Sequence, residues 1–317
     1  MTSDMIIKFF NCLKAEKYNI YGPEIQDDES DILELQEVPD LKLLEKVSAR
    51  PYKYHLMPIR EVLYKYKDNK LKEEFLKTKK QAFFGMSVFD LKALELYDRV
   101  FQNDVYYQNN RKNLLAVGYS SIPAKNYKTI FFTIDEKILE NIVFDVFIEG
   151  TKFYAQSYKG EKILKKCGLK YKKIDYNPRK EDKKVLAIKK VVETSKDSKL
   201  WEELGKICLA CGKCTIACPT CFCFDIESVL GPEKKAERCS GNCFYDDFTR
   251  IAGGHKFLNN PKDKIFFWYY HKFVRIPHEY GLPGCTDCGR CTAVCPVGID
   301  IEKNIVKLLK EVKNKKR

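Results

Sequence analysis

The first two-thirds of the chain alternate between short apolar runs and stretches with helical spacing. Residues 81–88 (QAFFGMSV) and 113–120 (NLLAVGYS) are almost wholly apolar, which predicts two buried strands. Between them, residues 90–101 (DLKALELYDRVF) place apolar side chains three and four positions apart, as a helix does. Two more apolar runs meet at Glu149-Gly150 and predict a β-hairpin. Strands alternating with helices indicate an α/β domain.

The pattern changes near residue 196. Residues 183–195 (KKVLAIKKVVETS) have the spacing of an amphipathic helix, the polar SKDSK follows as a linker, and residues 201–207 (WEELGKI) predict another helix. We therefore expect an α+β protein, with an α/β docking domain over 1–195 and a second domain over 196–317.

The amino-acid composition indicates a globular protein but does not identify its function. Hydrophobic residues make up 44% of the chain, which is typical of a globular protein. The formal charge is +13, with lysine and arginine concentrated in 161–200 and in the C-terminal tail. A basic chain can attract nucleic acid or an acidic protein, but a lysine-rich solvated surface is the simpler interpretation. The N-terminus lacks a signal-peptide pattern, and no apolar run reaches the ~18 residues of a membrane span, so we expect a cytoplasmic protein.

Cysteine placement is more informative. Twelve of the 14 cysteines lie between Cys208 and Cys295, and only Cys12 and Cys167 fall outside that segment. Secreted disulfide scaffolds are usually short, so dense clustering in a chain of this length indicates metal binding. We interpret Cys12 and Cys167 as lone thiols, buried or idle.

The cysteine-rich segment contains a short repeat. Residues 208–219 (CLACGKCTIACP) and 285–296 (CTDCGRCTAVCP) share their cysteines, central glycine, threonine and terminal proline. The spacing C-x2-C-x2-C-x3-C-P is typical of a [4Fe–4S] cluster site, in which the fourth cysteine binds the other cluster of a pair. The repeat therefore predicts two [4Fe–4S] clusters. Their ligands are expected to be Cys208, Cys211, Cys214 and Cys295 for the first, and Cys285, Cys288, Cys291 and Cys218 for the second.

Zinc is the alternative metal, because paired CxxC motifs also bind it and a basic zinc module would suggest nucleic-acid binding. Zinc sites usually use two separated pairs of ligands, whereas the x2, x2, x3 spacing with a following proline occurs twice here. The sequence favours iron–sulfur clusters.

The segment 220–284 separates the two motifs, which favours a helical dicluster ferredoxin-type domain with an insertion. Four additional thiols in it provide a possible third metal site: Cys221, Cys223, Cys239 and Cys243. The alternative is that these thiols stay reduced and unligated. Asp225 or His255 could substitute for one thiol, whereas His271 and His278 lie among aromatic residues and are more typical of core or surface histidines.

No nucleotide-binding motif accompanies the cysteines. GxGxxG and GxxxxGK[ST] are both absent, as are a nucleophile elbow and HExxH. The chain is thus expected to exchange electrons with other proteins rather than with a nicotinamide or flavin of its own.

The C-terminal motifs carry a family resemblance. With CxxCGxCTxxCPTCFCFDI, FTRIAGGHKF and CTDCGRCTAVCPVGIDI, residues 200–303 resemble the iron–sulfur β subunit of archaeal sulfhydrogenases and the A subunit of anaerobic sulfite reductases. Cys221, Cys223 and Cys239 match positions of that family, while Cys243 is an addition.

The N-terminal half is similar through FGMSVFDLKALELYDRVF, which resembles FGxRPCDLxALxxLDxVF, and Val88 and Phe89 stand where that pattern has proline and cysteine. The cysteines expected near 120–131 are absent, so no role for them is carried over. The resemblance implies a hetero-oligomer: an electron-transfer subunit between a flavin- or NAD(P)-binding partner and a catalytic nickel–iron hydrogenase or sirohaem sulfite reductase subunit.

Two other functions stay open at this point. The chain could itself be a catalytic reductase that uses a third, non-standard cluster in the insertion. It could also be a regulatory iron–sulfur protein that binds nucleic acid, as its charge would allow. Of the three functions, we expect the protein to be an electron-transfer subunit that is not catalytic alone and does not bind nucleic acid.

Overall fold

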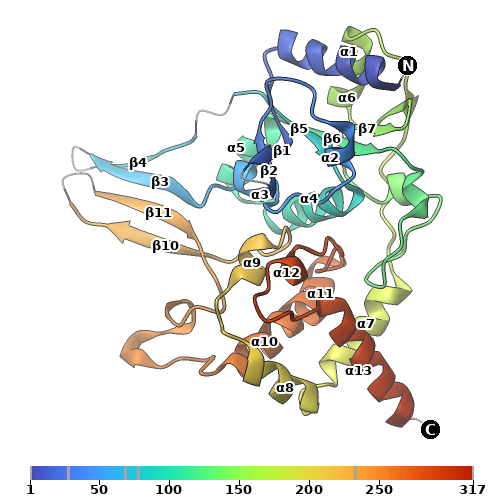
Figure 1. The fold of residues 1–317 in the computed structure, drawn as a ribbon. Coiled ribbons are helices and arrows are strands. Elements are labelled where there is room, and N and C mark those ends of the chain that lie inside the picture. Colours follow the sequence, from blue (N-terminus) through green and yellow to red (C-terminus); the bar gives the residue numbers. More distant parts are fainter. Residues whose placement is uncertain (1, 27–28, 68–69, 77–78, 232–233, 316–317) are drawn as a thin grey trace. The chain divides into compact units, whose positions relative to one another are not determined.

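The computed structural model of the protein describes two compact units (Figure 1). The described residues are 2–26, 29–67, 70–76, 79–231 and 234–315. The first unit is formed within residues 1–58, 75–129 and 134–179. The second is formed within residues 59–74, 130–133 and 180–317.

A seven-stranded sheet organises the first unit, in the order β2-β1-β5-β6-β7-β8-β9. Its strands are β1 (Asn19–Gln26), β2 (Glu29–Glu34), β5 (Gln81–Met86), β6 (Leu114–Ser120), β7 (Val146–Glu149), β8 (Lys152–Ala155) and β9 (Lys172–Lys173). Strands β1, β5, β6 and β7 run parallel to one another, β2 and β8 pair antiparallel with β1 and β7, and β9 is parallel to β8. Every residue of β6 is buried, as expected for a central parallel strand covered on both faces.

Helices cover the sheet of the first unit on both faces (Figure 1). They are α1 (Thr2–Ala15), α2 (Leu41–Leu44), α3 (Lys53–Leu56), α4 (Val88–Val100), α5 (Val105–Lys112) and α6 (Tyr158–Lys166), with 3₁₀ turns at η1 (Ala124–Asn126) and η2 (Ile138–Glu140). Helix α4 begins where the Ser87 hydroxyl accepts the backbone N–H of Asp90. One face of the sheet is covered by α1 and α6, whose apolar side chains share one core with Phe84 and Val117 of the sheet.

The predicted elements of this unit are confirmed. The two apolar runs form β5 and β6, the helical spacing between them forms α4, and the hairpin at Glu149-Gly150 is the β7–β8 pair. The fold class, α+β with an α/β N-terminal part, is confirmed with them.

The interpretation of Cys12 and Cys167 as lone thiols is wrong. Cys12 lies on α1 and Cys167 caps the end of α6, and the two form a disulfide with Cα atoms 5.7 Å apart. The two helices pack on the same face of the sheet, which brings together cysteines that are 155 positions apart in sequence. Sequence spacing alone carries no sign of such a long-range pairing.

The second unit combines helices with a four-stranded antiparallel sheet in the order β10-β11-β3-β4. Its strands are β3 (Arg60–Lys67), β4 (Lys70–Glu73), β10 (Phe224–Val229) and β11 (Lys234–Ser240). The β3–β4 hairpin belongs to this unit because β3 pairs with β11. Arg238 on β11 adds a buried ion pair with Glu61 on β3.

The helices of the second unit are mostly short. They are α7 (Lys183–Glu193), α8 (Lys199–Ile207), α9 (Lys213–Ala217), α10 (Pro261–Tyr270), α11 (Ile276–Tyr280), α12 (Arg290–Ala293) and α13 (Ile301–Lys315), with 3₁₀ turns at η3 (Asp247–Thr249) and η4 (Ala252–Gly254). The boundary predicted near residue 196 falls between α7 and α8, both of which lie in this unit. Within the described ranges, no helix is long and apolar enough to cross a bilayer.

A π-helical turn, η5 (His271–Arg275), joins α10 to α11. Pro277 follows it and has no N–H to donate to the carbonyl of Phe273, so the regular α-helical ladder is interrupted here. The wider turn carries Lys272, whose side chain is only 2% exposed. This turn therefore directs a charged residue into the interior.

Candidate iron–sulfur centres

The two cysteine loops share their backbone conformation as well as their sequence. Ala210 and Asp287 hold the same place in the two repeats, and both have positive φ, 51° and 59°. Gly212 (φ 73°) and Gly289 (φ 74°) follow, and each starts a short helix. Positive φ is costly for Ala and Asp, so it is kept only where the surrounding structure requires it. Each loop therefore curls around its cysteines in the same way.

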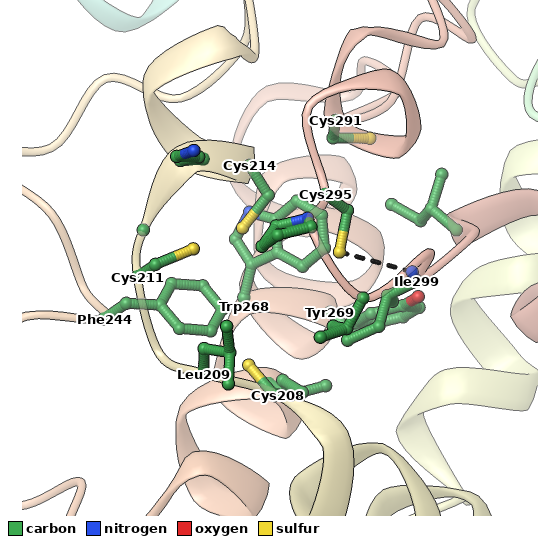
Figure 2. A pocket seen from close by; sticks show the side chains of 16 residues that line it. Cys208, Leu209, Cys211, Cys214, Phe244, Trp268, Tyr269, Cys291, Cys295 and Ile299 are labelled. Atoms are coloured by element: carbon green, nitrogen blue, oxygen red, sulfur yellow. Dashed lines mark hydrogen bonds between the residues drawn. The ribbon is translucent and has the colours of Figure 1, made fainter.

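The cysteines predicted to hold the first cluster surround one cavity (Figure 2). Its volume is ≈ 40 Å³, several times the ~10–15 Å³ that a single water needs. Cys208, Cys211 and Cys214 come from the first loop and Cys295 from the end of the second. Cys291 also reaches its wall, and the remaining lining is chiefly apolar, with Phe244, Trp268 and Tyr269 among the labelled side chains.

The cysteines of the other predicted set also lie close to one another. Cys285 interacts electrostatically with Cys291 and Cys218, and Cys291 interacts with Cys218 and Cys288. Burial raises the pKa of Cys291 to about 12 and that of Cys285 well above its ordinary value. Free thiols here would stay protonated, so binding a metal centre must displace their protons.

Backbone N–H groups donate to cysteine sulfurs in both loops. Ala210 donates to Cys208 Sγ over 3.3 Å, and Ile299 donates to Cys295 Sγ over 3.2 Å, which is the dashed line in Figure 2. Asp287 makes the equivalent bond to Cys285. Such donors stabilise thiolates and help to set the potential of a bound cluster. The donor sets therefore fit two thiolate-bound centres.

Lys272 was not predicted to take part in the site, although it lies against it. Its Nζ donates to Cys218 Sγ over 3.2 Å, to Thr220 Oγ1 over 2.8 Å and to the carbonyl of Gly284 over 3.0 Å. It also lies 3.8 Å from Cys221 Sγ. A sequence signal exists: Lys272 is a cation on a helical face otherwise formed by aromatic and aliphatic residues.

Asn242 was missed as well. Its side-chain amide donates to the carbonyl of Gly212 over 3.1 Å and accepts the backbone N–H of Phe244 over 3.0 Å. A Cβ on Gly212 would lie only 2.1 Å from the Asn242 amide nitrogen, so the first loop and the CSGNC segment require glycine at this contact. Asn242 thus fixes the insertion to the first cysteine loop.

Gly284, directly before Cys285, provides a test of how tightly the second loop is packed. A Cβ at this position would lie 2.0 Å from the carbonyl oxygen of Lys272, which is backbone and cannot move aside. We expect Gly284→Ala to cost about 1–3 kcal/mol of stability and to lower the iron bound at the second set. Iron content and thermal melting of anaerobically purified protein measure both effects.

Gly231→Ala is the matched control, because a Cβ there meets nothing within 4 Å. Full iron retention and an unchanged melting temperature in Gly284→Ala would contradict the close packing of the loop on η5.

The four cysteines of the possible third site do not share one environment. Cys243 hydrogen-bonds to Cys223 and interacts with Cys221. Cys239 instead pairs with Asp225 across β10 and β11, and its side chain hydrogen-bonds to Glu227. Three of the cysteines are therefore grouped, whereas Cys239 is buried on β11 beside the charged side chain of Glu227.

The histidines take the places expected for core and surface residues. His271 stacks on Phe267, and burial lowers its pKa to about 4. His255 and His278 are exposed. Within the described ranges, no three His, Cys, Asp or Glu side chains converge closely enough to hold a single ion.

Comparison with known proteins defines the class of the cysteine-rich segment: residues 207–299 match a family model described as a 4Fe-4S dicluster domain. The whole chain is similar to a particular protein, the sulfhydrogenase 2 subunit beta of Pyrococcus furiosus. The two are 28% identical over 340 aligned positions, which cover 98% of this chain and 97% of the relative. The resemblance inferred from the motifs is thereby confirmed. No solved structure shows detectable similarity.

In the first unit, the residues that replace the proline and cysteine of the family pattern, Val88 and Phe89, make apolar contacts. Val88 is buried at the start of α4, and Phe89 packs edge-on against Tyr127. Neither offers a ligand.

Proposed function

We propose that this protein is an electron-transfer subunit of a multi-subunit oxidoreductase and that it holds two [4Fe–4S] clusters. One observation carries the proposal: Cys208, Cys211, Cys214 and Cys295 line one apolar cavity although Cys295 belongs to the second repeat. This exchange of the fourth cysteine is how two-cluster ferredoxins hold their clusters close together. The match to a dicluster domain over residues 207–299 supports the same interpretation.

The partners follow from the similarity to a sulfhydrogenase β subunit. We infer that the chain transfers electrons between a flavin- or nicotinamide-binding subunit and a catalytic metal subunit, of hydrogenase or sulfite reductase type. The absence of a nucleotide-binding motif in the sequence supports a separate donor or acceptor subunit.

The residues of the second unit have separable tasks in this function. The eight cysteines of the two repeats would bind the clusters as thiolates, and the N–H groups of Ala210 and Ile299 stabilise that negative charge. Phe244, Trp268 and Tyr269 are buried side chains that exclude water from the first site. A bound [4Fe–4S] cluster supplies one-electron oxidation and reduction.

Replacing Cys288 by serine tests the proposal. We expect the second cluster to be damaged and electron transfer through the assembled complex to stop, because a conduit fails when one of its carriers is lost. Iron and acid-labile sulfide per chain, measured on anaerobically purified protein, should fall from about eight of each. Transfer is measured as donor oxidation coupled to the catalytic subunit.

The donor-oxidising and catalytic half-reactions, assayed separately with artificial dyes, are the control and should remain unchanged. Unchanged coupled activity in Cys288→Ser would rule out the conduit. Zinc with little sulfide in the native protein would instead rule out the clusters.

A second candidate function has one observation in its favour. Cys221, Cys223 and Cys243 are grouped, so they could hold a third cluster with incomplete thiolate ligation. In that case the chain would itself be a reductase, with substrate binding at the open iron. About twelve irons per chain and a spectrum perturbed by added sulfite or cyanide would support this function. About eight irons and no perturbation would reject it.

A further inference from the structure

The second cysteine set has a buried lysine, Lys272, beside it. Lys272 Nζ donates to Cys218 Sγ, Thr220 Oγ1 and the carbonyl of Gly284, at 3.2, 2.8 and 3.0 Å. Cys221 Sγ, at 3.8 Å, is a fourth acceptor, so the acceptors around this Nζ are enough to take all three hydrogens of an ammonium group. Over the part of the chain that the structure describes, no Asp or Glu forms an ion pair with it.

A buried charge without a counter-ion is strongly unfavourable, so its opposite charge has to lie close by. The nearest groups that can become anionic are the sulfurs of Cys218 and Cys221, at 3.2 and 3.8 Å. The neighbouring buried lysine, Lys264, shows the contrast, because Asp246 lies 2.6 Å from its Nζ. Lys272 is therefore placed as the counter-ion of the thiolate-bound centre itself.

This arrangement breaks the symmetry of the repeat. The fourth cysteine of the first motif, Cys218, has an ammonium group next to its sulfur. The fourth cysteine of the second motif, Cys295, accepts the backbone N–H of Ile299. A full positive charge stabilises the more anionic, reduced form of a cluster more strongly than a backbone dipole does.

We propose that Lys272 raises the reduction potential of the cluster held by Cys285, Cys288, Cys291 and Cys218, and so separates the potentials of the two clusters. The inference rests on the proposed function, since it needs a cluster at this cysteine set. Burial by itself lowers the potential of such a cluster, because it disfavours the extra charge of the reduced form. Lys272 offsets that effect and makes the second cluster a better electron acceptor.

The test is a redox titration of the complete chain with both clusters, followed by electron paramagnetic resonance. Lys272→Met removes the charge at similar volume, and Lys272→Gln removes the charge but keeps a hydrogen-bond donor. In both variants, we expect one midpoint potential to fall by at least about 59 mV, which corresponds to a tenfold change in the equilibrium constant of a one-electron reduction. The other midpoint should stay in place.

Two controls separate this effect from a loss of net charge or of structure. Lys307→Met removes an exposed lysine of α13, which pairs with Glu203, and should shift neither potential. The Lys272 shift should also persist between 0.05 and 0.5 M salt (roughly a threefold change in screening length), because a buried charge is little screened. The shifted signal is assigned in the Cys208→Ala/Cys295→Ala variant, because only the second cluster is expected there and its potential can be measured alone.

The outcomes are distinct. Unmoved potentials, or equal shifts of both, in a chain with eight irons would overturn the role of Lys272 and leave the proposed function intact. Loss of four irons from both Lys272 variants would also overturn it, by showing that the lysine holds the cysteines in place instead of tuning a bound cluster. A wild-type chain with fewer than eight irons would refute the proposed function itself.

Discussion

Replacing Cys208 and Cys295 together by alanine should leave one intact cluster, whereas replacing Cys285 and Cys295 together should leave none. The reason is that Cys295 follows the second set in sequence but lines the cavity of the first. Two ligands lost from the same cube empty one site and leave the other untouched. One ligand lost from each cube damages both.

The measurement is iron per chain together with the resonance signals of the dithionite-reduced protein. The Cys208/Cys295 variant should retain about four irons and one unaltered signal, while the Cys285/Cys295 variant should show neither normal signal. Cys239→Ala is the control, since Cys239 hydrogen-bonds to Glu227 on the sheet, and it should keep both signals. The opposite pattern in the two double variants would mean that each motif supplies all four ligands of its own cluster.

The elements that the sequence predicted are those whose signal is local. Strand β6 is buried on both faces and reads as an apolar run, and α4 has apolar residues at helical spacing. The two cysteine motifs also carry their chemistry within a dozen residues each, so eight candidate ligands could be named without a structure.

What the sequence could not predict depends on contacts between distant segments. Strand β3 pairs with β11, about 170 positions further on, and no local pattern specifies such a partner. Asn242 and Lys272 reach the cysteine loops in the same way, from an insertion whose own pattern is a hairpin and an aromatic helix. Only Lys272 left a trace, as a charge on an apolar helical face.

The four cysteines of the possible third site also show that sequence proximity is a poor guide to spatial proximity. Cys221, Cys223, Cys239 and Cys243 were treated together because they are close in sequence. Their places relative to β11 separate them: Cys239 lies within the strand and hydrogen-bonds to Glu227, whereas Cys243 lies beyond the end of the strand and hydrogen-bonds to Cys223. Nearness in sequence therefore does not imply a shared site.

Reducing the Cys12–Cys167 disulfide should destabilise the first unit by about 2–5 kcal/mol. The bond links α1 to the end of α6 across a separation of 155 positions, and a cross-link over so long a loop removes much of the freedom of the unfolded chain. Both helices pack on the sheet core beside Phe84, so their loss would expose the apolar face of β5 and β6. Disulfides of this kind persist in oxidising compartments and in the intracellular proteins of hyperthermophiles.

Hydrogen exchange of β5 and β6 amides, with and without reductant, measures the effect in the unit that contains the bond. Both tryptophans, Trp201 and Trp268, lie in the second unit, so their fluorescence provides an internal comparison that should not respond. The Cys12→Ala/Cys167→Ala variant should match the reduced protein and be insensitive to reductant. If Cys12 and Cys167 are both alkylated in denatured protein that was never reduced, the bond does not form in solution. In that case, the pair contributes to stability only through its packing between the two helices.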